Sequence, residues 1–171
     1  MARFVDILVQ DGLDAPIDVI VEPDESDLVD LRHRRLRHHW WAAQRERERL
    51  PRRGDIDSIF LAEINDYVMI VKVDGADLRY QTYGRAITRA YGRDMTGRSL
   101  NAFPSTMGQL FRSVYRLCAA QRVPVFTRHK PPPAVGVDFW LRLIVPLGES
   151  GPDEITHFLV CNVPVGETLA L

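Results

Sequence analysis

Cysteine is scarce in this chain, which has only Cys118 and Cys161 among its 171 residues. Two isolated cysteines cannot build a disulfide framework or a Cys-x-x-Cys metal site, so we expect buried free thiols in a reducing compartment. Long apolar runs are also missing, because no stretch approaches the roughly 20 residues of a membrane helix. The N-terminus is too acidic, and its apolar run too short, for a signal peptide. These absences predict a cytoplasmic protein without a membrane span.

A surplus of positive charge is missing too, because 22 Lys and Arg face 23 Asp and Glu, a formal net charge of −1. A protein that binds nucleic acid over much of its surface needs excess cations to neutralise phosphates, so the composition argues against that class. With 46% hydrophobic and 26% charged residues, the chain is otherwise an ordinary globular protein. Its length suits one domain with a substantial core.

Recognisable catalytic motifs are absent as well. The sequence has no Gly-x-Ser-x-Gly element, no Cys–His pair in a known context and no glycine-rich phosphate loop. Four carboxylates gather near a boundary between loop and strand, where caps and turns explain them best: Asp55, Asp57, Glu63 and Asp66. We predict that the chain is not an enzyme. The alternative, a small α+β enzyme, requires strongly shifted pKa values within one pocket.

The beginning of the chain divides into two segments. Residues 1–25 form an arm in which Ile17, Val19 and Val21 alternate with polar residues, which predicts one short strand paired on a sheet edge or on a partner. Residues 26–54 are helical in character, with Ser26 expected to cap the helix and a Pro-Arg-Arg-Gly stretch ending it. The apolar residues of this segment recur near helical spacing, at Leu28, Leu31, Leu36, Trp40, Ala43 and Leu50.

Residues 55–171 are predicted to form an α+β domain. Alternation over 67–73 and 78–84, around an Asp-Gly turn, predicts a hairpin. Short helical pieces over 85–103 precede an amphipathic helix at about 106–122, in which apolar residues recur every three or four positions. Three further strands follow, at 125–130, 138–147 and 155–163. We predict five antiparallel strands with helices on one face, because the helices then bury the apolar face of the sheet.

This order of elements is also that of a PAS (Per-Arnt-Sim) domain. Four stretches resemble a group of small stand-alone bacterial PAS proteins: HWWAAQRERERLPRRGDID, YVMIVKVDG, LRYQTYGRAITRAYGRDMTGRSL and WLRLIVPLGESG. The most distinctive part is YGRDMTGRSL, in which Gly92 and Gly97 allow tight turns between short helices and Asp94 or Thr96 can cap them. The resemblance covers roughly residues 38–165.

The resemblance implies a PAS-like five-stranded antiparallel sheet, with helices on one face and an N-terminal helix packed near the sheet. It also implies a helical wall around a ligand pocket and frequent dimerisation through N-terminal helices. No kinase, cyclase or DNA-binding module follows the last strand in this sequence. We therefore expect a sensory or regulatory module of bacterial signal transduction, which acts through contacts with a partner protein and is open to modulation by a small ligand.

Seven residues are candidates to line that pocket. The polar ones are Tyr80, Tyr91, Arg142 and Asn162, and the apolar ones are Met69, Phe111 and Leu143. A few convergent polar groups among apolar side chains are the usual make-up of a small-molecule site. The strand at 138–147 is apolar on both faces, so its alternation leaves open which face is inward and whether Arg142 lies inside the pocket. A filled core without a ligand is the alternative.

The Arg- and His-rich stretch 32–53 is the second feature that can carry function. Leu36, Trp40, Trp41 and Arg45 are the candidate residues of a homodimer or partner interface, with one tryptophan on the sheet and the other covered by a second subunit. Two alternatives stay open. One is a solvated helix face whose glutamates offset the arginines, and the other is a nucleic-acid-associated protein that binds through this stretch.

No metal site is predicted from the histidines of that stretch. Helical ligands must be three or four residues apart to face one centre, and no pair among His33, His38 and His39 has that spacing. No cysteine or carboxylate cluster completes a ligand set.

The sequence does not determine a cofactor. A light-sensing flavin domain requires a reactive cysteine in the region 85–100, which has none, and Cys118 is expected to pack in the core instead. A haem requires an axial ligand. His129 and His157 are the strand histidines available, but a histidine on a strand is more often exposed or hydrogen-bonded than a ligand.

Overall fold

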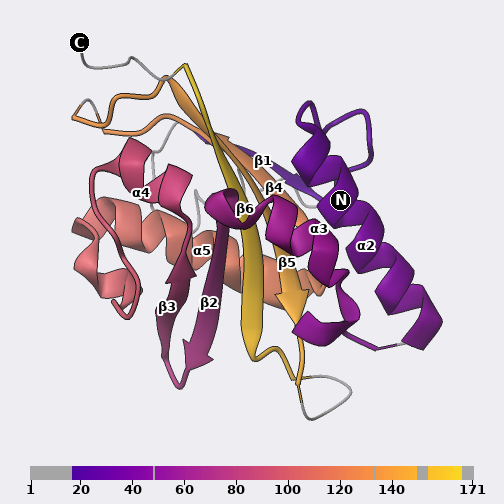
Figure 1. Cartoon of the computed structure of the whole chain (residues 1–171). Coiled ribbons are helices and arrows are strands. Elements are labelled where there is room, and N and C mark those ends of the chain that lie inside the picture. Colours follow the sequence, from indigo (N-terminus) through magenta and orange to yellow (C-terminus); the bar gives the residue numbers. More distant parts are fainter. Residues whose placement is uncertain (1–16, 48, 133, 150–153, 167–171) are drawn as a thin grey trace.

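The chain folds as one antiparallel sheet with helices on both faces (Figure 1). The structure is a computed structural model that describes residues 17–47, 49–132, 134–149 and 154–166. Residues 1–16 of the predicted arm lie outside these ranges. The division of the chain at residues 25 and 54 stays a prediction.

Six strands of the described residues make up the sheet, in the order β1-β4-β5-β6-β2-β3. Their bounds are β1 Ile17–Val21, β2 Val68–Asp74, β3 Asp77–Tyr83, β4 Val125–His129, β5 Phe139–Leu147 and β6 His157–Val165. The helices are α2 Leu31–Arg47, α3 Ser58–Glu63, α4 Arg85–Tyr91 and α5 Ser105–Gln121, with short 3-10 turns η1 Arg53–Asp55, η2 Asn65–Tyr67 and η3 Leu100–Ala102. The strands and the long helix predicted beyond residue 55 are confirmed, and their ends shift by at most two residues.

The predicted number of five strands is wrong by one, because β1 adds a sixth. It pairs with β4 along its whole length, from Ile17 opposite His129 to Val21 opposite Val125. The backbone N–H of Glu22 then donates to the carbonyl of Pro124 at 2.8 Å. The short strand of the arm therefore lies on the edge of the chain's own sheet and not on a partner.

The N-terminal helix begins later than predicted. Ser26 does not cap it, because its backbone and hydroxyl are bonded to Asp24 within a preceding turn. Asp30 takes that role, accepting a hydrogen bond from the backbone N–H of Arg32 at 2.8 Å. A carboxylate at this position also suits the positive end of the helix dipole.

Two apolar clusters lie on opposite sides of the sheet, because successive side chains of a strand point to opposite faces. On the α5 face, side chains of α4, η3 and α5 pack against residues such as Val71, Ile144 and Val160. On the α2 face, side chains of α2 and α3 pack against residues such as Leu143 and Leu159. Figure 1 shows α2 and α3 on one side of the sheet and α5 on the other. The N-terminal helix thus covers the second face of the sheet.

Candidate functional site

The α5 face of the sheet carries polar side chains on three neighbouring strands. Thr127 of β4 lies opposite Arg142 of β5, which lies opposite Asn162 of β6. Directly opposed residues on one face have Cβ atoms about 4.5–5.5 Å apart. His129 is two residues beyond Thr127 and therefore shares its face, where it packs edge-on against Phe111 of α5. We call Thr127, His129, Arg142 and Asn162 the interior polar row.

Every residue of the interior polar row is buried, with at most 4% of its surface exposed. Each also has polar atoms without a hydrogen-bond partner among the described residues, namely Thr127 Oγ1, Asn162 Oδ1, Arg142 Nε and both ring nitrogens of His129. One such buried atom costs about 1–3 kcal/mol, and folded proteins satisfy almost all of them with protein or water. Their concentration at one place is what a bound water cluster or a polar ligand would satisfy.

Arg142 brings a full positive charge into this row. Its guanidinium carbon lies 4.2 Å from the centre of the Phe111 ring. No ion pair joins it to a carboxylate of the described residues. Because an unpaired buried charge is unfavourable, the arrangement favours an anionic group at this position.

His129 complements Arg142 as a neutral group. Burial, followed by the charge of Arg142, holds the pKa of His129 well below its ordinary value. The ring is therefore neutral near pH 7, with one nitrogen as a donor and the other as an acceptor. The row thus offers hydrogen-bond donors and acceptors around a single cation.

Two tyrosines stand beside the row, Tyr80 of β3 and Tyr115 of α5, each 1% exposed. Burial raises the pKa of both phenols, that of Tyr115 to about 12, while the positive charge of Arg142 acts in the opposite direction. Both hydroxyls are therefore protonated at neutral pH. Among the described residues, the hydroxyl of Tyr115 makes no well-formed hydrogen bond, although it lies close enough to Tyr80 for the two phenols to affect each other's pKa.

The seven predicted pocket residues separate into three groups. Met69, Tyr80, Phe111, Arg142 and Asn162 lie on the α5 face. Tyr91 is half-buried at the rim of that cluster, against Phe103. Leu143 belongs to the cluster on the α2 face, because it follows Arg142 directly on β5, and its inclusion in the pocket was wrong. Thr127 and Tyr115 were missed, and His129 is neither exposed nor hydrogen-bonded, contrary to the prediction.

The predicted partner interface on α2 needs a similar correction. Leu36 is fully buried and Trp40 is 1% exposed, and both pack in the α2-face cluster of this chain. Trp40 donates its Nε1–H to the carbonyl of Pro146 at 2.8 Å, so it is the tryptophan that packs on the sheet. Trp41 is half-buried and Arg45 is exposed. These two are the members of the predicted set that a partner can still reach.

The four carboxylates considered for catalysis have structural roles. Asp57 caps α3 by accepting from the Phe60 N–H at 2.7 Å. Asp55 accepts from the Arg52 N–H at 2.8 Å and forms ion pairs with two arginines. Glu63 and Asp66 are ion-paired with arginines of α2 and α4, respectively. Caps, turns and ion pairs therefore account for all four, as the sequence predicts.

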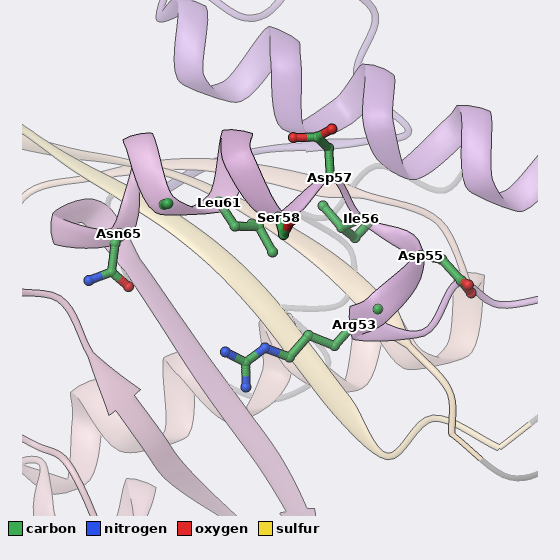
Figure 2. Close-up of a pocket in the computed structure, with 9 residues that line it drawn as sticks. Arg53, Asp55, Ile56, Asp57, Ser58, Leu61 and Asn65 are labelled. Atoms are coloured by element: carbon green, nitrogen blue, oxygen red, sulfur yellow. The ribbon is translucent and has the colours of Figure 1, made fainter.

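A surface pocket of about 670 Å³ lies beside these carboxylates, around η1 and α3. In Figure 2, Arg53 and Asn65 reach toward the same space, while Asp55 and Asp57 point away from it. The pocket is open to solvent and its lining residues carry no buried unpartnered atom. The interior polar row is therefore the stronger candidate site.

The described residues contain no group of three or more His, Cys, Asp and Glu side chains able to hold a metal. Cys118 is buried on α5 and donates to the carbonyl of Val123, and burial raises its pKa, so it is an unreactive core thiol, as expected. Cys161 lies on the α2 face. Neither cysteine is placed on the segment 85–100, where light-sensing flavin chemistry would require one.

Within the described residues, no helix has the length and apolar character needed to cross a membrane.

An antiparallel sheet with a helical wall over one face and buried polar groups beneath that wall defines an α+β domain of the sensor type. The chain belongs to the PAS domain family, whose sequence pattern it matches over residues 31–159. Members of this family are generally sensory modules without enzymatic activity. A search of curated proteins found no match.

Among solved structures, the fold is similar to that of an RNA-binding light-oxygen-voltage receptor. The two chains are 15% identical, with a TM-score of 0.50 over 91% of this chain and 40% of the receptor. The chain thus spans about two fifths of the receptor's length. At this identity the likeness shows the fold alone.

Proposed function

We propose that the protein is a PAS-family sensory module that binds a small polar molecule at the interior polar row and signals through contacts with a partner protein. The observation that carries the proposal is the set of buried, unpartnered atoms gathered around Arg142. Donors on Arg142, Thr127 and His129 suit an acidic oxygen, and the Asn162 carbonyl suits a donor on the ligand. The neighbouring aromatic rings suit the apolar remainder.

Native mass spectrometry on freshly purified protein, combined with an absorbance scan, tests this proposal. The expected result is a retained small molecule whose mass is lost after denaturation. The absorbance scan identifies a haem or a flavin at the same time. Protein that carries no extra mass, and gains no thermal stability from a panel of small organic acids, contradicts the proposal.

The variant Arg142→Met separates a ligand role from a packing role. Removing an unpaired buried charge leaves the empty protein equally stable or raises its free energy of unfolding by about 1–3 kcal/mol. The retained molecule is expected to be lost. Arg128→Met, at an exposed position of β4, is the matched control. A loss of several kcal/mol in Arg142→Met instead identifies Arg142 as a structural residue.

For signal output, we propose that the exposed side of α2 around Trp41 and Arg45 contacts a partner protein or a second copy. Sedimentation of the wild-type chain and of Arg45→Glu tests the second copy. A dimer that weakens in Arg45→Glu supports the surface, whereas identical sedimentation of the two proteins rejects a homodimer through it.

Nucleic-acid binding through residues 32–53 is the second candidate function. Arg45, Arg52 and Arg53 are exposed, and the structurally similar receptor is RNA-binding. Against it, four other arginines of the stretch are paired with carboxylates, which reduces the charge offered to phosphates. Phosphate-driven binding must weaken steeply as salt rises from 50 to 200 mM. Absence of RNA and DNA binding at low salt removes this candidate.

A further inference from the structure

A groove separate from the interior polar row opens between the β2–β3 hairpin and α5. Its volume is about 400 Å³, within the range of small-ligand pockets. The floor comes from the sheet, with Val73, Leu78 and Phe158, and the wall comes from α5, with Arg112, Tyr115 and Ala119. We call these six residues the hairpin groove.

The floor of the hairpin groove is apolar. Val73 and Leu78 lie opposite each other across the hairpin, and Phe158 of β6 is buried and packs on the Tyr115 ring with centroids 4.9 Å apart. Small residues surround this floor, namely the turn Gly75–Ala76 on one side and Ala119 on the other. Because these residues lack long side chains, the groove is not filled by the protein itself.

The charge available in the groove is positive. Arg112 is half-buried. It lies on the same face of α5 as Tyr115, one helical turn further on, and Ala119, two turns further on. It forms no ion pair with a described residue. Asp77, the carboxylate at the edge, is already engaged, because it accepts from the Leu78 N–H and from the Ser99 hydroxyl, both at 2.8 Å. Arg116 also lines the groove, but it is exposed and already has an interaction partner. An anion in the groove therefore meets the guanidinium of Arg112 and no free carboxylate.

We propose that the hairpin groove binds an amphipathic organic acid, with a medium-length hydrocarbon chain on Phe158 and Leu78 and its carboxylate at Arg112. This site is distinct from the one proposed at the interior polar row, although the two adjoin. Tyr115 is the residue they share, since it lines the groove and lies close enough to Arg142 for that charge to act on its pKa. An acid in the groove thus contacts a wall of the interior site.

Calorimetric titration of the full chain with sodium hexanoate, sodium octanoate and 1-octanol tests the proposal. Each added methylene is expected to raise the affinity about fourfold, because burying one methylene contributes about that factor. Octanol has the chain without the charge, so it is expected to bind about tenfold more weakly than octanoate. Amide chemical shifts should change at the hairpin turn and at residues 112–119.

Two variants and one control assign the site. Arg112→Gln is expected to lower the affinity for octanoate to that for octanol and to leave octanol unchanged, while Ala119→Leu fills the groove and weakens both. Arg89→Gln, at an exposed arginine of α4, should behave as wild type, and circular dichroism verifies folding. Three results overturn the proposal: no octanoate binding at millimolar concentration, binding unaffected by Arg112→Gln, or binding lost in Arg142→Met, which would place the acid at the interior row.

Discussion

His33 of α2 is fully buried on the α2 face, and its Nε2–H donates to the carbonyl of Cys161, 3.2 Å away. Burial lowers the pKa of His33 to about 4, whereas histidine in an unfolded chain titrates near 6.5. Between these values the unfolded state takes up a proton that the folded state does not. The free energy of unfolding therefore falls as the pH drops from about 6.5 to about 4.

We predict that the contribution of His33 lowers the free energy of unfolding by roughly 2 kcal/mol between pH 7.5 and pH 5. Urea unfolding at each pH measures it, and His33→Gln, which cannot titrate, should lose this part of the pH dependence. Burial lowers the pKa of His129 as well, so some dependence of the same sign remains. His38→Gln, at an exposed position of α2, is the control, and an unchanged pH slope in His33→Gln contradicts the prediction.

The sequence can predict which face of the sheet a site residue occupies only where one face of its strand is exposed to solvent. Arg142 and Leu143 are neighbours on β5, so they face opposite sides, but β5 is covered on both faces and its alternation carries no inward signal. Thr127 and His129 escaped prediction because polar residues on a strand usually mark the solvent face. Only contact with α5 shows that they are buried.

At the level of elements, the start of α4 depends on a close approach between the backbone at Gly84 and the backbone at Asp66. Gly84 precedes α4, and a Cβ added there would lie 2.2 Å from the carbonyl oxygen of Asp66. No side chain fits at that distance, so the backbone of η2 or α4 must move to admit one. Glycine at this position is therefore a requirement of packing.

We predict that Gly84→Ala lowers the free energy of unfolding by about 1–3 kcal/mol, the usual effect of overpacking. Gly54→Ala is the matched control, because a Cβ there meets nothing within 4 Å; its effect should stay within about 0.5 kcal/mol. Urea unfolding of both variants makes the comparison. Equal stability of the two variants would show that the backbone near Asp66 moves to admit the new methyl group at no cost in stability.

Elements with a clear period were predictable, and those set by longer-range contacts were not. The hairpin and α5 follow from alternation or helical spacing, and the last three strands follow from short apolar runs bounded by turn residues. The start of α2 was misplaced because several Ser and Asp residues in 24–30 are all suitable caps, and tertiary packing decides among them. The sequence does not predict which strand pairs with β1 either, since a short edge strand can pair equally well with another chain.

At the scale of the whole molecule, β1 closes one edge of the sheet. Without it, β4 would present unpaired backbone N–H and C=O groups over Val125–His129. An open edge of this kind favours strand addition from another molecule.

We predict that deleting residues 1–22 makes the protein self-associate. Sedimentation velocity over a range of concentrations should show larger species that grow with concentration. Deleting residues 1–16 retains β1 and should leave the sedimentation of the wild type unchanged. If both deletions sediment alike, β1 does not protect the edge.

The hydrogen bond from His33 to Cys161 has a mechanical consequence. The carbonyl that accepts it belongs to the peptide group that joins Cys161 to Asn162. This peptide group is a rigid plane. It is hydrogen-bonded to α2 on one face of the sheet, and it leads directly to Asn162, whose side chain lies on the other face. A molecule that binds at the proposed interior site and moves Asn162 would therefore also shift the carbonyl that accepts the His33 hydrogen bond. A change on one face of the sheet would then reach α2 on the other face through a single peptide group.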